Sequence, residues 1–125
     1  MLDFKTMGAL AGLLKNREKL EAVGRRIRDE LAATEVVGEA GGGAARVTVG
    51  GDLKVRAVAL EPAVAQGLGA DEQSRQMAQQ LIAEATNDGL ALAQRAAREI
   101  VQREAAALGL PDLAGQLGGL GGLLP

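Results

Sequence analysis

The sequence predicts an α+β fold in the order α-β-β-β-α, with a three-stranded antiparallel meander flanked by two long helices. Segment 35–62 holds nearly all the consecutive β-branched residues of the chain. Two breaks, Gly41-Gly42-Gly43 and Gly50-Gly51, divide this segment into three short runs. Short β-branched runs separated by glycines are typical of hairpins, and a long apolar periodicity on each side indicates a helix.

The first helix is predicted over residues 7–33. Leu13, Leu20 and Ile27 recur every seven residues and therefore lie on one helical face. Gly24, in mid-helix, costs about 1 kcal/mol relative to alanine. Two explanations stay open for it: the backbone of a partner helix comes close, or the helix tolerates a weak position.

Strands are predicted at 35–39, 45–49 and 52–60, with a loop at 40–44. In the middle strand, apolar side chains alternate with Arg46 and Thr48, as expected when one face is buried. Gly50-Gly51 is expected to form a two-residue turn with positive φ at both positions.

The larger side chains of the third strand change parity after Val55. A bulge near Arg56-Ala57 would place Val55, Val58 and Leu60 on one face. The alternative is a strand that a dimer buries on both sides.

Pro62 ends the third strand, and residues 63–70 are expected to connect it to the second long helix through one helical turn begun by the proline. Asp71 is the expected N-cap of that helix, predicted at 72–108. Arg95, Glu99 and Arg103 have the spacing for ion pairs along its exposed side. Its predicted apolar stripe comprises Met77, Leu81, Ile82, Ala85, Gly89, Leu92, Ala96 and Ile100.

The 125 residues are expected to form one domain over residues 1–108, followed by a Gly/Leu-rich flexible tail at 109–125. The sequence contains no Cys, His, Trp or Tyr, and Phe4 is its single aromatic residue. A core without rings is thin for three strands and two helices, so we expect a homodimer.

The composition also argues against an enzyme. Catalytic triads need an imidazole or an equivalent base, and zinc sites need Cys or His. The glycines at 38–43 do not end in the Gly-Lys-Ser/Thr of a phosphate loop. We therefore expect no catalytic residue, no metal, no cofactor and no small-molecule substrate.

No apolar run approaches the 18 or so residues of a membrane span. Asp3, and the lack of a small-residue cleavage site before Lys15, argue against a signal peptide in segment 7–14. We expect a cytoplasmic protein without a membrane partner.

The order of helix, VxGE, glycine loop, VTVxG and VxxVxLEP resembles the YbaB/EbfC family of nucleoid-associated proteins. The resemblance covers about residues 7–101. The matching residues are Val36, Gly38 and Glu39, then Val47 to Gly50, then Val55, Val58, Leu60, Glu61 and Pro62, and finally Asn87-Asp88. The resemblance implies an intertwined, tweezer-like homodimer that binds duplex DNA in the nucleoid with little sequence preference.

Non-specific DNA binding is largely the neutralisation of phosphates by Lys and Arg. On the wheel of the first helix, Lys15, Lys19 and Arg26 form a stripe well away from the Leu13/Leu20/Ile27 face, with Arg25 beside it. Arg17 and Arg28 lie on the opposite flank. These six residues are the candidate DNA contacts, and an ordinary solvated helix face is the alternative explanation for them.

A second hypothesis is a dimeric scaffold that binds another protein without any role for DNA. The net charge of −2 favours it. The partner would bind the apolar stripe of the second helix or the Leu-rich tail.

Overall fold

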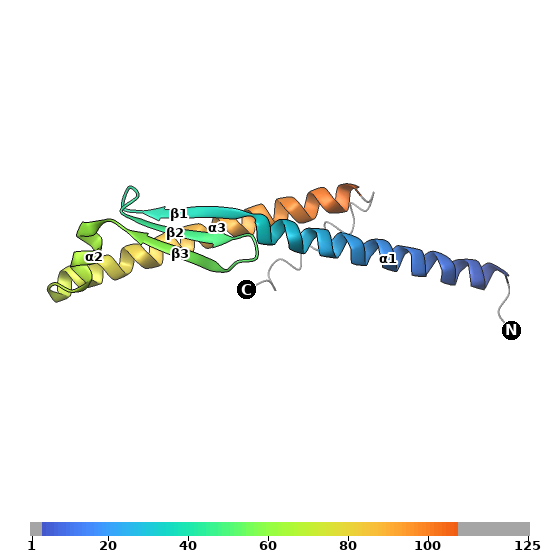
Figure 1. Ribbon diagram of the computed structural model, residues 1–125, viewed down its shortest axis with the longest axis horizontal. Helices are drawn as coiled ribbons and strands as arrows, with labels where there is room; N and C mark the ends of the chain where they lie inside the picture. The colour runs from blue at the N-terminus through green and yellow to red at the C-terminus, as the bar shows by residue number, and fades with distance from the viewer. Residues whose placement is uncertain (1–3, 108–125) are drawn as a thin grey trace.

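The computed structural model describes the backbone of residues 4–107 and the side chains of residues 16–107. The predicted α-β-β-β-α order is confirmed, with one short helix added between the sheet and the last helix. The predicted tail at 109–125 lies outside the described residues. The elements are α1 (Phe4–Ala33), β1 (Glu35–Ala40), β2 (Ala45–Gly50), β3 (Val55–Leu60), α2 (Pro62–Leu68) and α3 (Glu72–Ala107) (Figure 1).

The end of α1 is closed by Thr34. Its hydroxyl donates to the carbonyl of Glu30 at 2.7 Å, and its amide donates to the carbonyl of Leu31 at 3.3 Å. These bonds satisfy two carbonyls that have no partner inside the helix. The chain then enters β1 directly, so the direction of α1 is tied to the edge of the sheet.

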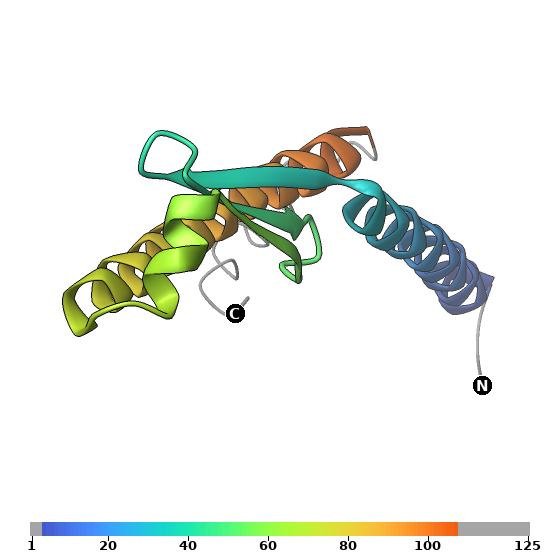
Figure 2. The same cartoon turned by 60° about the vertical axis from the view of Figure 1, so that its left-hand side comes forward.

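Most of α1 extends past the sheet, and within the described residues its C-terminal part contacts α3 through Arg26 and Glu30 (Figure 2). Among residues 16–33, Val23 alone is buried. Leu20, which the sequence places on an apolar seam with Leu13 and Ile27, is 46 % exposed. The side chain of Leu13 lies outside the described residues, and Ile27 is half-buried. The described part of the seam is therefore largely uncovered within one chain.

The three strands form an antiparallel sheet in the order β1-β2-β3. Gly41, Gly42 and Gly43 join β1 to β2 with φ of 64°, 66° and 95°. Residues with a Cβ rarely adopt this left-handed region, so the glycine loop is a requirement of the hairpin.

The predicted two-residue turn at Gly50-Gly51 is wrong. The connection runs to Lys54, β3 begins at Val55 instead of 52, and the positive φ of 64° falls on Leu53. Close contact explains the two glycines better than conformational freedom does. A Cβ on Gly51 would lie 2.7 Å from the carbonyl oxygen of Leu31, at the end of α1.

The predicted bulge in the third strand is confirmed. Thr48 pairs with Ala57 but Val49 pairs with Val55, so Arg56 is the extra residue of β3. Paired residues of neighbouring antiparallel strands point to the same face of a sheet. The bulge therefore places Val55, Val58 and Leu60 on the face that carries Val49, Val47 and Ala45.

The expected turn after the sheet is a seven-residue helix, α2, with a proline at its start. The expected N-cap of α3 is confirmed, because Asp71 accepts a hydrogen bond from the Ser74 amide at 2.8 Å and another from the Ser74 hydroxyl at 3.1 Å. These two hydrogen bonds lower the pKa of Asp71 below its ordinary value of 3.8.

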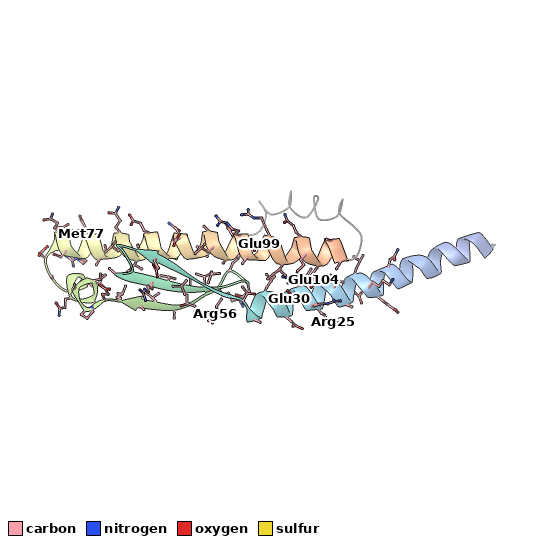
Figure 3. All side chains as sticks on the ribbon, turned by 90° about the horizontal axis from the view of Figure 1, so that it is seen from above. Arg25, Glu30, Arg56, Met77, Glu99 and Glu104 are labelled. Atoms are coloured by element: carbon pink, nitrogen blue, oxygen red, sulfur yellow. The ribbon has the colours of Figure 1, made fainter. Side chains whose placement is uncertain are left out.

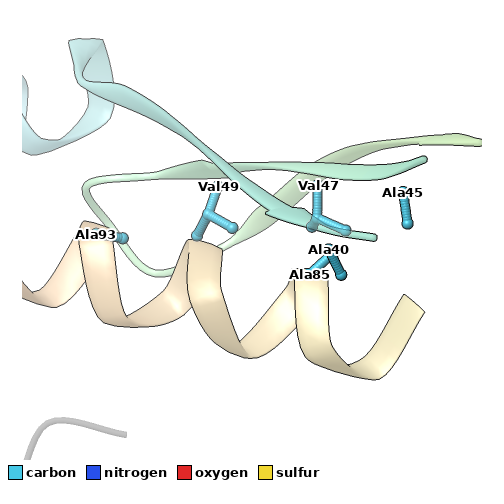
Figure 4. Close-up of a cluster of buried hydrophobic side chains, with 6 residues drawn as sticks. All are labelled: Ala40, Ala45, Val47, Val49, Ala85 and Ala93. Carbon is cyan, nitrogen blue, oxygen red and sulfur yellow. The ribbon is translucent and has the colours of Figure 1, made fainter. Parts of the chain in front are cut away.

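The core lies between α3 and one face of the sheet (Figure 4). Val47 and Val49 of β2 are fully buried there, opposite Ala85 and Ala93 of α3. Small residues on the helix let it lie close to the strands. The closest approach is at Gly38, where an added Cβ would lie 2.1 Å from the backbone nitrogen of Gly89.

One side chain of α3 also completes the hydrogen bonding of β1. The amide of Glu39, on the edge strand, donates to Asp88 Oδ2 at 2.9 Å. The Asp of the Asn87-Asp88 pair therefore has a structural partner in the strand that carries the VxGE motif.

The predicted apolar stripe of α3 is partly wrong. Met77 is 61 % exposed, while Leu92 and Ala96 are half-buried. The helix contacts the sheet through smaller residues because these allow the helix and the strands to lie closer together than Met or Leu would. The buried residues of α3 are Ala78, Ala85, Gly89, Ala93, Ala97, Ile100, Glu104 and Ala105.

The third strand is left uncovered. α3 packs mainly on β1 and β2, so Val55 and Val58 stay 48 % and 50 % exposed although they share the face of the core. The apolar face of the sheet is thus wider than the helix that covers it.

Candidate nucleic-acid interface

The candidate interface is the second half of α1, residues 16–33, which begins to separate from α3 where the sheet ends (Figure 2). Val23 and Glu30 lie on its inner side, toward α3. The segment carries five basic and four acidic residues. Its net charge is small, so the ion pairs decide how strongly it can attract an anion.

Three of the predicted DNA contacts are exposed cations: Lys19, Arg25 and Arg28. Within residues 16–107, the structure contains no ion pair to any of them. Arg25 lies on the side of α1 away from α3 (Figure 3). Unpaired, solvated cations on a projecting helix can reach phosphates without breaking an existing contact.

The other predicted contacts differ from these three. Arg17 Nε is 3.3 Å from Glu21 Oε1, an exposed pair one helical turn apart. Arg26 points toward α3, where its Nη1 is 3.7 Å from Glu104 Oε2. The side chain of Lys15 lies outside the described residues. Of the predicted stripe, Lys19 is therefore exposed to solvent, whereas Arg26 points toward the neighbouring helix.

A second group of cations lies on α3, where the sequence indicated ion pairs along the helix axis. Arg103 pairs with Glu30 of α1, not with Glu99. Arg95 and Arg98 are exposed, and the described part of the chain gives neither an ion-pair partner. Sequence reasoning set this helix aside, and the signal that could have identified it was the spacing of Arg95 and Arg98, which places both on neighbouring turns of the helix.

An apolar groove of about 390 Å³ lies at the opposite end of the molecule, between α2 and α3. Its lining includes Val64, Met77 and Leu81 and contains no charged side chain. The position of Met77 beside this groove accounts for its exposure. A groove of this kind suits apolar side chains and supplies no group for acid–base chemistry.

Two further searches concern metals and membranes. Within the described residues, His, Cys, Asp and Glu form no group of three or more that could hold a metal ion. The helices of that same part are too short or too polar for any of them to cross a membrane.

The comparison with protein families decides the assignment of the fold. The YbaB/EbfC DNA-binding family matches the chain over residues 7–108. The chain belongs to this family. The match spans all the elements from the first helix to the last, and this is a family of DNA-binding proteins, not of enzymes.

Two known proteins are similar to this chain. The nucleoid-associated protein Pfl01_1806 of Pseudomonas fluorescens (strain Pf0-1) is 36 % identical over 80 residues, which cover 64 % of this chain and 70 % of that protein. The crystal structure of the uncharacterized protein HP0035 from Helicobacter pylori matches with a TM-score of 0.50. It covers 88 % of this chain and 98 % of its own at 19 % identity, so it supports the fold alone.

Proposed function

We propose that this YbaB/EbfC protein binds duplex DNA as a homodimer with little sequence specificity, and that it acts in the bacterial nucleoid on DNA organisation or gene expression. Family membership and the name of the Pseudomonas relative support the role. The observation that carries the proposal is the set of exposed, unpaired cations on α1: Lys19, Arg25 and Arg28.

The chemistry available on α1 suits phosphate contacts better than base recognition. Phe4 is the only aromatic residue of the sequence, so stacking on the bases of single strands has almost no side chains to use. Lys and Arg neutralise phosphates on any duplex and release counterions. Backbone contacts of this kind give affinity without reading the sequence.

The homodimer is supported by the apolar surface that one chain leaves bare. Val55 and Val58 continue the core face of the sheet beyond the edge of α3, and Leu20 stands half-exposed on α1. β3 is also an edge strand, with backbone groups free to pair or to be covered. A second copy that covers this face would bring two α1 helices into one particle.

The dimer gives the proposal a quantitative form. Three phosphate contacts from each of two helices make about six, so the log–log salt dependence of binding should have a slope near −5. The measurement is gel retardation of a generic duplex, titrated at several salt concentrations.

The decisive variant is Arg25→Glu combined with Arg28→Glu. It removes about four of the six contacts, so the slope should fall to about −2 and binding at low salt should weaken strongly. The matched control is Arg46→Glu combined with Arg75→Glu, at the other end of the molecule, which changes net charge equally. If both pairs weaken binding to the same extent, α1 is not the contact surface.

A second double variant, Arg95→Glu with Arg98→Glu, tests whether α3 contributes to the same interface. Weakening comparable to that of the α1 variant would extend the interface to both helices. Unchanged binding would confine it to α1.

The groove between α2 and α3 favours one other function, a protein-binding scaffold. It offers an apolar lining with Met77 beside it, and the net charge of −2 does not attract DNA over long range. A wild-type protein that forms dimers but retards no duplex at low salt would select the scaffold over the DNA-binding role.

A further inference from the structure

Glu30 and Glu104 lie between the helices where α1 begins to separate from α3 (Figure 3), and two arginines join them in a cluster of four charged side chains. Arg103 of α3 pairs with Glu30 of α1, and Arg26 of α1 lies 3.7 Å from Glu104 of α3. The pairs cross between the helices in opposite directions. Together the four side chains connect α1 to α3 at the last point where the two helices are close.

Glu104 is unusual among these four. It is the one buried charged residue in the described part of the chain, with only 10 % of its side chain exposed. Its cation, Arg26, is too distant for a hydrogen bond of ordinary length. Buried carboxylates normally need close pairing, and the ion pair of Glu104 within residues 16–107 is longer than that.

The second carboxyl group, on Glu30, lies against the first. A hydrogen bond between the two carboxyls is the main cause that raises the pKa of Glu30 above its ordinary value of 4.5, followed by burial. Arg103 opposes the shift without cancelling it. When two carboxyl groups are adjacent, the state with one proton bound is favoured over the state in which both are ionised, because like charges repel. Within residues 16–107, Arg26 and Arg103 are the only cations paired with either.

Both arginines are more accessible to solvent than the acids they pair with. The side chains of Arg26 and Arg103 are 58 % and 63 % exposed, so solvent and a phosphate can reach them from outside. The carboxyl groups are the more enclosed members of each pair.

We infer that Arg26, Glu30, Arg103 and Glu104 form a proton-dependent clasp between α1 and α3. While the two acids are ionised, the clasp keeps both arginines away from DNA. When the Glu30–Glu104 pair takes up a proton, it releases them to phosphates. The inference rests on the proposed DNA binding and adds a regulation to it.

The physical reason is competition between carboxylate and phosphate for the same guanidinium groups. When a phosphate binds one of the arginines, the two carboxylates lose that cation and lie together beside a polyanion. Binding of one proton to the carboxylate pair relieves the resulting electrostatic repulsion. DNA binding is then coupled to proton uptake, so affinity rises as pH falls. Linkage limits the effect to about tenfold per pH unit for each proton taken up.

The first test measures duplex affinity by fluorescence anisotropy at constant salt from about pH 8 down to pH 4.5, the ordinary value above which the pKa of Glu30 is raised. Glu30→Gln is the main variant because Glu30 is only half-buried and its replacement keeps the shape of the side chain. We expect several-fold tighter binding at neutral pH and a flat pH profile. The matched control is Asp29→Asn, an exposed neighbour with the same charge change, which should keep the wild-type profile.

The second test follows the carboxyl carbon of Glu30 by NMR in the full chain, without DNA. The Glu30 pKa should lie above 4.5 in the wild type and should fall in Glu104→Gln, where Arg103 still favours the ionised form. Adding duplex should raise the wild-type pKa further. A role that only holds the helices together would not predict this last change.

The outcomes separate the two proposals. If no variant binds duplex at any pH, the DNA-binding proposal fails and the clasp fails with it. If the wild type binds but Glu30→Gln shows the same pH profile, only the clasp is overturned. A Glu30 pKa that changes neither in Glu104→Gln nor on addition of DNA would also overturn the clasp.

Discussion

Gly38 of β1 and Gly89 of α3 pack backbone against backbone: a Cβ built on Gly38 would lie 2.1 Å from the nitrogen of Gly89 and 2.3 Å from the carbonyl oxygen of Ala85. A Cβ on Gly89 would in turn lie 2.7 Å from a methyl of Val49. No side chain can enter either position unless helix and strand move apart. This contact sets the distance at which α3 lies on the sheet.

The first prediction is that Gly38→Ala destabilises the fold by about 3 kcal/mol or more, because backbone atoms cannot yield as a flexible side chain can. Chemical denaturation of the purified variant measures the loss. A variant with wild-type stability would mean that the helix shifts at little cost and that the contact does not set the spacing.

The second prediction concerns Gly24 of α1, where none of the atoms that the structure describes lies within 4 Å of an added Cβ. Gly24→Ala should stabilise the protein by up to about 1 kcal/mol through helix propensity alone. The same denaturation experiment serves, and the variant is a control for Gly38→Ala. A loss of stability together with dissociation of the dimer would instead indicate that a partner helix approaches this glycine.

The third prediction concerns the cap of α3. Asp71→Ala should lower the thermal midpoint by a few degrees because the Ser74 amide loses its acceptor, whereas Asp71→Asn should keep most of the stability at neutral pH. The folded-state pKa of Asp71 is depressed, so its stabilisation is present above the unfolded value and is lost as pH falls through the folded value.

Thermal unfolding at a series of pH values checks that sign. The difference between wild type and Asp71→Asn should stay constant near neutrality and shrink as the solution is acidified toward and below pH 3.8. A difference that grows on acidification would contradict the assigned direction.

The fourth prediction tests the uncovered face of the sheet. Val58→Asp should weaken the dimer at least about a hundredfold, because a carboxylate without a counter-charge would be buried in the interface. The subunit should stay folded, since Val58 is already exposed in one chain. Ala59→Asp is the control, because the neighbouring side chain points to the other face. Sedimentation velocity distinguishes the species, and a Val58→Asp dimer of normal strength would place the interface elsewhere.

The fifth prediction compares two ion pairs of the sheet. Arg56 donates to Glu35 at 3.0 Å and to the Ala32 carbonyl at 2.6 Å, with most of its side chain covered. Arg56→Ala should therefore cost about 1–2 kcal/mol, whereas Arg46→Ala breaks a more exposed pair with Glu39 and should cost less than about 0.5 kcal/mol. Equal losses by denaturation would mean that the contact with the end of α1 contributes nothing.

Much of the fold could be predicted from local chemistry. The periodicity of α1 and α3, the alternation in β2, the Asp71 cap and the bulge at Arg56 all follow from interactions between residues close in sequence. Gly50 and Gly51 were misassigned because close contacts account for them: Gly51 lies against Leu31 of α1, some twenty residues earlier, and Gly50 lies against the side chains of Asp52 and Arg56. Met77 was misassigned because the wheel of a helix does not reveal how near the helix lies to its neighbour.

The candidate site shows the same division. Helical spacing brought Lys19 and Arg26 onto one stripe, yet in the structure they have different surroundings. Lys19 stays in solvent, while Arg26 lies beside Glu104, a residue 78 positions away in the sequence. Spacing along one helix describes only that helix, so it could not show which cations have a carboxylate facing them.

The sequence by itself determined the order of the main elements, their approximate ends and the absence of Cys and His. Only the tertiary structure decided which apolar side chains are covered, which arginines are paired and where two carboxyl groups from different helices meet. The reason is physical: secondary structure depends on contacts within a few residues, whereas burial and charge pairing depend on surfaces that meet only when the chain folds.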